Sequence, residues 1–391
     1  MSRAVKYYSL LEPSGYGLAA LAYIESLLGM GVHVYWTPLV NSQQGYIPWT
    51  WMENAQQQVT VLIGSLVDNP DLASTLVQSL KPVDSYQCIV MHTVPEYWPR
   101  LIEPDGYHIG YTVWETSVLP KHFPGIINQM DKVLVPTEFN RTVFEQSGVV
   151  IPIEVVPHIL NLNHGLPVMQ EAGKAVSDKE RYVFYSINVW AARKAMWTLV
   201  HCYLKAFTGD DAVELRLKTS LTGPKHEQDT QTHRTERLVE EIREQYSNPA
   251  KIHMICENIT EREIAILHSE GDCYVSTTHS EGWGLGAFEA AGYGNPVIMT
   301  GWGGQLDFLP NELAYLIRYR LVNVEDKLGF DSYSPDQHWA EVDEEHTIEL
   351  MQHVYQHQAI AKKRAQRLAP DLANRFNADV IGTTLHNAIF S

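Results

Sequence analysis

The stretch from His279 to Asp307, HSEGWGLGAFEAAGYGNPVIMTGWGGQLD, constrains the fold of this chain more than any other part of the sequence. An apolar run just before it, at 273–278, predicts a buried strand. The glycines at 282–286 predict a tight loop that opens a helix, and the apolar run at 297–300 predicts the next strand. A strand, a glycine loop, a helix and a strand in this order are typical of an α/β sheet.

The glycine loop also predicts an anion site. Where such a loop leads into a helix N-terminus, several backbone N–H groups point the same way, and the helix dipole adds to them. We expect Gly284, Leu285 and Gly286 to contribute to this site. Glu281 before the loop and Glu289 in the helix add carboxylates, which accept hydrogen bonds from hydroxyl groups. A ligand that carries both phosphates and many hydroxyls fits these features, and a nucleotide sugar is such a ligand.

A glycine loop alone is equally consistent with an ordinary β-loop-α-β unit and a helix cap. Here, however, the spacing Glu281-(seven residues)-Glu289, set in EGWGLGAFEA and followed by GNPVI, resembles the signature of the retaining family 4 glycosyltransferases of the GT-B fold. The resemblance implies that Glu281 holds the hydroxyls of the donor sugar and that Glu289 holds the ribose of the nucleotide. It extends, more weakly, over most of the chain.

A basic pair, Arg193 and Lys194, follows the predicted strand at 182–187. Two cations at the carboxyl end of a strand suit a diphosphate, whose negative charge grows as the glycosidic bond breaks. A solvated surface pair is the plain alternative. The resemblance implies a paired Arg and Lys at the diphosphate: the Lys matches Lys194, whereas the family's Arg falls on Asn188. Either Arg193 or Asn188 therefore fills the second diphosphate position.

The first half of the chain begins with a predicted strand at 4–10, a glycine turn and a helix at 18–28. The turn, which contains Gly15 and Gly17, resembles a dinucleotide fingerprint, but the second predicted strand, 32–39, ends without the acidic residue that would bind a ribose. We therefore expect Gly15 and Gly17 to lie near the donor at the mouth of a cleft, or to form a purely structural turn.

Two more candidates follow later strands of the first half. His92 ends the predicted strand at 87–91, where parallel sheets place their ligands, although a hydrogen-bonding role in the core is an equal alternative. Several relatives have a histidine after the following strand, where this chain has Trp114 and Glu115. Glu115 is therefore a candidate contact for the acceptor hydroxyl or the donor sugar, or else a surface acid.

Strand–helix units repeat in both halves of the chain, which predicts an α/β protein with two doubly wound parallel sheets. Two such Rossmann-like domains that face each other across a cleft form the GT-B fold that the resemblance implies. We expect an acceptor-side domain at 1–165, a nucleotide-sugar-binding domain at 166–370, and a terminal helix at 371–391 that packs back on the first domain.

Other segments carry weaker expectations. The residues at 59–64 predict a short strand, and those at 222–236 predict a polar, mobile segment. We expect an acidic insertion at 325–345 and a long helical region at 349–374 that is interrupted at Pro370.

Composition narrows the class of protein. Hydrophobic residues make up 45% of the chain and charged residues 19%, which is ordinary for a globular protein, and no apolar run reaches the ~18–20 residues of a membrane span. The formal net charge of −17 argues against a nucleic-acid partner and leaves at most a peripheral membrane contact. Cys88, Cys202, Cys256 and Cys273 lie mostly in apolar contexts and predict buried, reduced thiols in a cytoplasmic protein.

These observations together predict a metal-independent hexosyltransferase that uses a nucleoside-diphosphate sugar, UDP- or GDP-linked, and a hydroxyl acceptor that is a glycan, a lipid or a small molecule. The resemblance implies retention of configuration. We expect no permanent cofactor, and no metal site because no acidic pair of the DxD type stands in a suitable loop. Another GT-B enzyme, such as a nucleotide-sugar epimerase or a phosphorylase, and a non-catalytic sugar-binding protein are the alternatives. The oligomeric state stays open.

Overall fold

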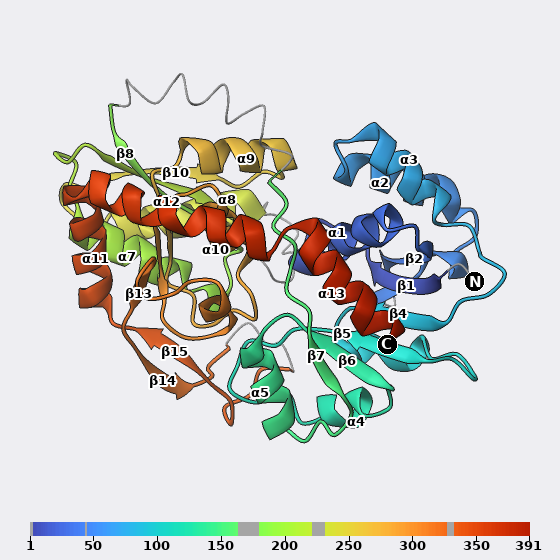
Figure 1. Ribbon diagram of the computed structural model, residues 1–391. Coiled ribbons are helices and arrows are strands. Elements are labelled where there is room, and N and C mark those ends of the chain that lie inside the picture. Colours follow the sequence, from blue (N-terminus) through green and yellow to red (C-terminus); the bar gives the residue numbers. More distant parts are fainter. Residues whose placement is uncertain (1–2, 44, 163–179, 221–230, 327–331) are drawn as a thin grey trace. The chain divides into compact units, whose positions relative to one another are not determined.

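The computed structural model describes residues 3–43, 45–162, 180–220, 231–326 and 332–391. Its contacts divide the chain into two compact units (Figure 1). Unit 1 contains Met1–Trp114, Val118–Asn161 and Asn374–Ser391, and unit 2 contains Glu115–Ser117 and Leu162–Ala373. The domain boundary expected at 165/166 lies outside the described residues.

Unit 1 is built on a seven-stranded sheet with the order β3-β2-β1-β4-β5-β6-β7. All neighbouring strands are parallel except β2 and β3, which are antiparallel. The strands are β1 (Ala4–Leu10), β2 (His33–Ser42), β3 (Gly45–Pro48), β4 (Cys88–His92), β5 (His108–Tyr111), β6 (Lys132–Val135) and β7 (Ile153–Val155).

The helices of unit 1 include the last helix of the chain, α13. With η denoting a 3₁₀ helix, they are α1 (Gly15–Gly29), η1 (Trp49–Trp51), α2 (Ala55–Leu66), α3 (Pro70–Gln78), η2 (Pro95–Arg100), α4 (Phe123–Ile127), α5 (Glu138–Gln146) and α13 (Ala378–Phe390). The α13 helix packs on α1, where the Ser26 hydroxyl donates to the Ala378 carbonyl at 3.1 Å. A side chain at Gly382 would collide with the Ser26 hydroxyl, so glycine permits this close approach.

Unit 2 is built on a six-stranded, all-parallel sheet with the order β10-β9-β8-β11-β12-β13. Its strands are β8 (Tyr182–Ile187), β9 (Val213–Lys218), β10 (Lys251–Ile255), β11 (Cys273–Ser276), β12 (Val297–Thr300) and β13 (Tyr315–Ile317). A separate antiparallel pair consists of β14 (Tyr319–Asn323) and β15 (His338–Val342).

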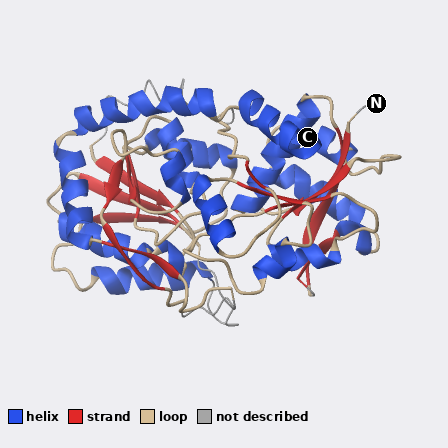
Figure 2. Cartoon of the chain, turned by 60° about the horizontal axis from the view of Figure 1, so that its bottom comes forward, coloured by secondary structure: helices blue, strands red, loops and turns tan. Residues whose placement is uncertain are grey.

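The helices of unit 2 flank its sheet (Figure 2). They are η5 (Ala192–Lys194), α7 (Met196–Ala206), α8 (Gln231–Arg243), α9 (Glu261–Glu270), α10 (Leu285–Gly292), η6 (Gly304–Asp307), α11 (Glu344–Gln356) and α12 (Gln358–Arg375), the last of which ends in unit 1. The core between β8, α7 and α11 includes Phe184, Tyr203 and Met351, all fully buried. Because helices cover the sheet, its central strands are buried along their length, which explains why they are apolar runs in the sequence.

Several predicted elements are confirmed to the residue: the strands at 4–10, 182–187 and 297–300. The strand predicted at 59–64 is wrong, because these residues belong to α2. The glycine turn is also corrected. Gly15 and Gly17 lie in the first turn of α1, where the Ser14 hydroxyl caps the helix by accepting from the Gly17 amide at 3.3 Å.

The C-terminal half of unit 2 differs from the prediction in two further places. The acidic insertion expected at 325–345 contains β15, although residues 327–331 are not among those described. Pro370 does not interrupt the helix, since α12 continues through it to Arg375. Pro370 is exposed, so the carbonyl that loses its helical partner can bond to water. Of the segment predicted to be mobile at 222–236, residues 222–230 lie outside the described part, and the rest belongs to α8.

Candidate active site

The strand order of unit 2 determines where a site can form. The carboxyl ends of β8 and β11 are neighbours, but the chain leaves β8 toward β9 on one side and leaves β11 toward β12 on the other. Open α/β sheets bind their ligands at such a switch point. The loop after β8 carries Arg193 and Lys194, and the loop after β11 carries Glu281.

Arg193 lies between two carboxylates of unit 2. Its Nη1 donates to the Ser280 carbonyl at 2.6 Å and to Glu281 Oε2 at 3.0 Å. Its Nη2 is 3.2 Å from Glu115 Oε1. Burial alone would lower the pKa of the guanidinium, but Glu115 and Glu281 outweigh it and raise that pKa above the ordinary value. Arg193 is therefore a fixed positive charge held in one orientation.

Lys194 also forms an ion pair with Glu281, with 2.5 Å between Lys194 Nζ and Glu281 Oε1. Burial raises the pKa of the Glu281 carboxyl, but the charges of Lys194 and Arg193 outweigh it and hold that pKa below its usual value. Burial, together with the neighbouring Arg193, lowers the pKa of the Lys194 ammonium even though Glu281 opposes the change. The structure thus brings together two cations and a carboxylate that the sequence predicted separately.

Glu115 is the second carboxylate beside Arg193, and it belongs to unit 2 although it follows a strand of unit 1. Its backbone carbonyl accepts from the Ser280 hydroxyl, and its Oε2 accepts from Tyr333 Oη at 3.1 Å. Ser117, two residues later, donates its amide to the His338 carbonyl at 2.9 Å. The description of Glu115 as a surface acid is therefore wrong, since its side chain is only 16% exposed.

The glycines at 284 and 286 shape the start of α10. Gly284 precedes the helix with a φ of 97°, a conformation that other residues adopt only with strain. A Cβ atom at Gly286 would lie 2.8 Å from Tyr274 Oη and 3.2 Å from the Ile187 carbonyl, so glycine lets the helix approach the ends of β8 and β11. The first amides of α10, beginning at Leu285, have no acceptor within the helix and are available to an anion.

A second glycine loop, which contains Gly303 and Gly304, contacts the backbone of Glu281. The Gly304 amide donates to the Glu281 carbonyl at 2.8 Å. Gly303 has a φ of 120°, and a Cβ atom there would lie 2.9 Å from the same carbonyl. This loop is therefore a support for the carboxylate.

Asn188 lies at the end of β8 but forms different contacts from Arg193. Its Nδ2 approaches three hydroxyls at the strand ends, those of Ser186 at 3.2 Å, Tyr274 at 3.3 Å and Ser276 at 3.4 Å. Arg193, in contrast, is hydrogen-bonded to the same carboxylate as Lys194. Of the two candidates, Arg193 is thus the one that lies beside Lys194.

Glu289 has an environment unlike that of Glu281. It lies within α10, its side chain is 28% exposed, and its Oε2 is 3.2 Å from Nε2 of the buried His268. His268 Nδ1 is 3.0 Å from Tyr185 Oη, and the imidazole stacks on Tyr293 with 5.2 Å between ring centroids. Among the described residues, the buried imidazole of His268 is thus the hydrogen-bonding neighbour of the Glu289 side chain.

The remaining predicted residues, His92, Gly15 and Gly17, belong to unit 1 and are not part of this group. His92 is buried at the end of β4, where its Nδ1 is 2.9 Å from Tyr7 Oη. Its Nε2 has no hydrogen-bond partner among the described residues. Burial, and then the neighbouring His158, lower the pKa of His92 well below its usual value, so this imidazole is neutral. This environment is consistent with both roles predicted for His92, a ligand contact and a hydrogen-bonding role in the core.

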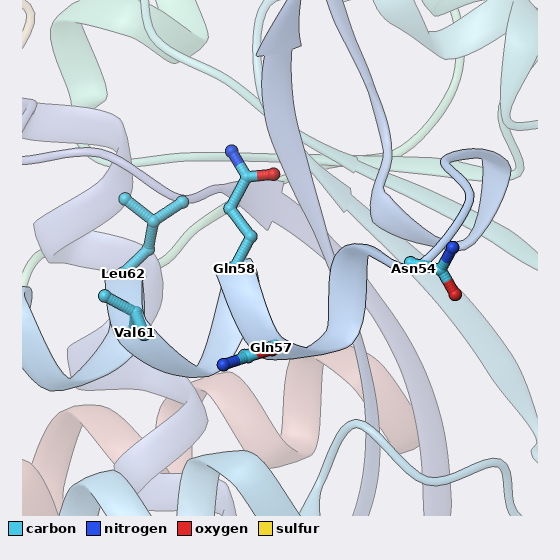
Figure 3. Close-up of a pocket in the computed structure, with 5 residues that line it drawn as sticks. All are labelled: Asn54, Gln57, Gln58, Val61 and Leu62. Atoms are coloured by element: carbon cyan, nitrogen blue, oxygen red, sulfur yellow. The ribbon is translucent and has the colours of Figure 1, made fainter.

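A shallow hollow lies on α2 of unit 1 and contains none of the predicted residues. Figure 3 shows Gln58 and Leu62 extending from one side of the helix, with Asn54 just before its first turn. The hollow is lined by Asn54, Gln57, Gln58, Val61 and Leu62, none of which titrates. We therefore place the chemistry in unit 2.

The described part of the chain shows neither a metal-binding cluster nor a membrane-spanning helix. Within it, no group of three or more His, Cys, Asp or Glu side chains could hold a metal ion. None of the helices in those same ranges is long and apolar enough to cross a membrane. The four cysteines are buried and free, as the sequence predicted.

Solved structures that resemble this chain include sucrose-phosphate synthase from Thermosynechococcus elongatus, with a TM-score of 0.69, 15% identity, and coverage of 99% of this chain and 98% of that chain. HepE from Anabaena, in complex with UDP-glucose, gives a TM-score of 0.65 at 14% identity, with 98% of both chains covered. Trehalose 6-phosphate synthase from Burkholderia multivorans gives 0.61 at 12% identity, with 100% of this chain and 98% of that chain covered. No family model matches the chain, and no curated protein matches it in sequence.

At these identities the likeness establishes the fold. The chain has the GT-B fold, with two Rossmann-like parallel sheets, which confirms the predicted fold class. The sequence did not single out three residues that contact the candidate site residues or their neighbours: Tyr185, His268 and Tyr333. They lie far from their partners in the sequence, and no local spacing signals their contacts.

Proposed function

We propose that this chain is a metal-independent, retaining glycosyltransferase of the family 4 type, which transfers a hexose from a nucleoside-diphosphate sugar to a hydroxyl acceptor. One observation carries the proposal: Arg193, Lys194 and Glu281 form a single hydrogen-bonded group at the switch point of unit 2. The start of α10 follows Glu281 by four residues and adds unpaired helical amides to the same loop.

The two cations and the amides suit the leaving group. Cleavage of the glycosidic bond leaves the shared electron pair on the nucleoside diphosphate, so negative charge develops on its terminal phosphate. Lys194 and Arg193 would bind this charge as fixed, buried cations, assisted by the amides of Leu285 and Gly286. Because the side chains of Lys194 and Arg193 are only 14% and 18% exposed, water screens their charge weakly.

The two glutamates would bind the hydroxyl-bearing ends of the donor. Glu281 is ionised, and each of its oxygens can accept a second hydrogen bond beyond those from Lys194 and Arg193. It would orient the donor sugar through its hydroxyls. Glu289 would accept hydrogen bonds from the ribose. Retention means that the acceptor oxygen attacks the sugar carbon on the face from which the diphosphate departs, and the acceptor proton leaves with that phosphate.

A UDP-sugar is the donor that we propose. HepE, whose fold this chain shares, binds UDP and UDP-glucose, and this supports the choice without excluding a GDP-sugar. We assign acceptor binding to unit 1, with His92 as a candidate contact, and we keep Gly15 and Gly17 as candidate contacts of the donor. The acceptor is a glycan, a lipid or a small molecule. The four buried, free cysteines support a cytoplasmic location.

A donor panel tests the proposal. Purified protein would be mixed with UDP-, GDP-, ADP- and dTDP-sugars, and thermal shift and nucleotide release would be recorded with and without EDTA. We expect one donor to raise the melting temperature and release nucleotide equally well in EDTA, and Glu289→Ala to lose the shift. Proton NMR of the product would report the anomeric configuration. A nucleotide sugar changed in its sugar but not cleaved would indicate an epimerase, and absence of any shift would contradict the proposal.

A further inference from the structure

Glu289 ends a chain of hydrogen bonds that begins on α12 and runs through the interior of unit 2. Lys362 Nζ donates to Asn295 Oδ1 at 2.8 Å. Asn295 Nδ2 donates to the His268 carbonyl at 2.6 Å and to Tyr185 Oη at 2.9 Å. Tyr185 Oη contacts His268 Nδ1, and His268 Nε2 contacts Glu289 Oε2.

Groups that can only donate or only accept fix the direction of the hydrogen bonds in this chain. An ammonium only donates and a backbone carbonyl only accepts, so Lys362 and the His268 carbonyl set the orientation of the Asn295 amide. Since Asn295 donates to Tyr185 Oη, the single hydroxyl proton of Tyr185 is directed to His268 Nδ1. Burial raises the pKa of Tyr185 well above its usual value, which keeps that proton on the phenol.

The tautomer of His268 follows from the same reasoning. Its Nδ1 accepts from Tyr185, so the ring proton is on Nε2 and is donated to Glu289 Oε2 at 3.2 Å. Glu289 Oε1 receives no hydrogen bond from the described residues. The Glu289 side chain is 28% exposed, so its remaining acceptor sites are open to hydroxyl donors from a ligand as well as to water.

We propose that His268 is a positioning residue that holds Glu289 so that its free oxygen meets the ribose diol of the nucleotide, and that this arrangement sets a preference for ribonucleotides over 2′-deoxyribonucleotides. The inference rests on the proposed function, because it takes Glu289 as the ribose contact. It adds that the directed chain Lys362–Asn295–Tyr185–His268, and not Glu289 alone, determines selectivity at the sugar of the nucleotide.

The test compares the affinities of UDP and 2′-deoxy-UDP, with GDP and 2′-deoxy-GDP as a second pair, by isothermal titration calorimetry. In Tyr185→Phe and His268→Phe the carboxylate loses its fixed orientation. We expect the Kd of the ribonucleotide to rise about tenfold, equivalent to about 1.4 kcal/mol, while that of the deoxyribonucleotide changes little. The ratio of the two Kd values therefore falls. His268→Gln, whose side-chain amide can donate from nearly the same place as Nε2, should restore much of the preference.

Matched controls separate positioning from stability. Tyr203→Phe removes a buried hydroxyl of the same unit that donates to the Lys251 carbonyl at 2.9 Å, outside the chain of bonds. It should lower the melting temperature about as much as Tyr185→Phe and leave the Kd ratio unchanged. Lys362→Met should weaken the preference, whereas Lys363→Met, at the adjacent exposed position, should not.

The outcomes for this inference and for the proposed function are distinct. If Glu289→Ala abolishes the preference but Tyr185→Phe and His268→Phe keep it, the positioning role is overturned and the proposed function stands. If Glu289→Ala binds both nucleotides as the parent does, Glu289 is not the ribose contact, and both fail. A collapse of the ratio in all three variants, with rescue by His268→Gln, supports the inference.

Discussion

Arg193, Lys194 and Glu281 form a buried ion group, and replacing Glu281 with glutamine is its sharpest test. The substitution removes one charge and keeps nearly the same side-chain shape. Lys194 Nζ and Arg193 Nη1 donate to the two carboxylate oxygens at 2.5 and 3.0 Å. Glutamine keeps a single acceptor oxygen and directs an amide N–H group at the other cation. Arg193 retains Glu115, whereas Lys194 would lose the one ion-pair partner that it has within the described part of the chain.

The expected cost follows from the burial of the group. Breaking one side of a buried ion pair costs about 3–5 kcal/mol, and the remaining carboxylate of Glu115 places the expected loss near the lower end, about 3 kcal/mol. For a domain of this size, such a loss lowers the melting temperature by about 6–12 °C. The matched control is Glu344→Gln, which removes an ion pair with Lys205 whose two side chains are 47% and 46% exposed. Such a surface pair contributes about 0–1 kcal/mol.

The same variant separates the roles of the cations and the carboxylate. Because Lys194 and Arg193 no longer share their charge with Glu281, UDP should bind at least as tightly as it does to the parent. Turnover of the donor should fall about 100-fold or more, since an oriented charged contact to the reacting sugar is lost. Calorimetry measures the first quantity and a nucleotide-release assay the second. If a folded Glu281→Gln protein turns over normally, or no longer binds UDP, the assignment of these roles is wrong.

Acid titration provides an independent check of the ion group. The pKa of Glu281 is lowered from 4.5 in the folded protein, so its stabilising effect is present above about pH 4.5 and disappears as the pH falls through the lower folded pKa. The difference in melting temperature between the parent and Glu281→Gln should therefore shrink on acidification below pH 4.5. A difference that stays constant from pH 7 to the acid limit would contradict the electrostatic origin of the effect.

Three further predictions concern the scaffold. Gly286→Ala should weaken UDP binding and destabilise the protein by about 1–3 kcal/mol, whereas Gly64→Ala, where a Cβ atom meets nothing within 4 Å, should stabilise it by about 0.4–1 kcal/mol in thermal or urea unfolding. Thr260→Ala removes the capping box of α9 and should cost about 1 kcal/mol, with UDP affinity unchanged. Burial lowers the pKa of His158 to about 3, so the unfolded chain binds a proton below about pH 6.5 that the folded chain does not. Stability should therefore fall by about 1 kcal/mol between pH 7 and 5.5, and His158→Gln should reduce this slope while the exposed control His253→Gln does not.

The sequence predicted the parallel strands well because of where they lie. Strands such as β8 and β12 are covered by helices, so nearly every residue is apolar and the run ends where burial ends.

The error at α2 has an equally physical cause. Val59, Val61 and Ile63 alternate as in a strand, but Val59 and Ile63 are buried one helical turn apart, and Val61 is 65% exposed. Three β-branched residues at alternate positions fit both periods, so only tertiary packing decides between them.

The candidate site divides in the same way into a local and a non-local part. Glu281, Glu289 and the glycines between them lie in one continuous motif whose geometry is local, and the sequence was sufficient to single them out. The partners that give these residues their properties come from other elements: Tyr333 beside Glu115, and His268 beside Glu289. A sequence separation of 218 residues in the first case leaves no periodic signal to find.

Glu281 and Glu289 look equivalent in the sequence, but their environments in the structure differ. Glu281 accepts from two buried cations, one on each oxygen, so each oxygen keeps one acceptor site beside a positive charge. Glu289 accepts from His268 and pairs with no Lys or Arg among the described residues, so its unused acceptor sites can take hydroxyl groups without breaking a contact of the protein. Under the proposed function, the ribose would therefore meet a carboxylate with a histidine donor, whereas the sugar would meet a carboxylate flanked by the cations that bind the diphosphate. A diphosphate that competes for Lys194 and Arg193 would weaken their bonds to Glu281, so the charge balance of these three residues would couple diphosphate binding to sugar binding.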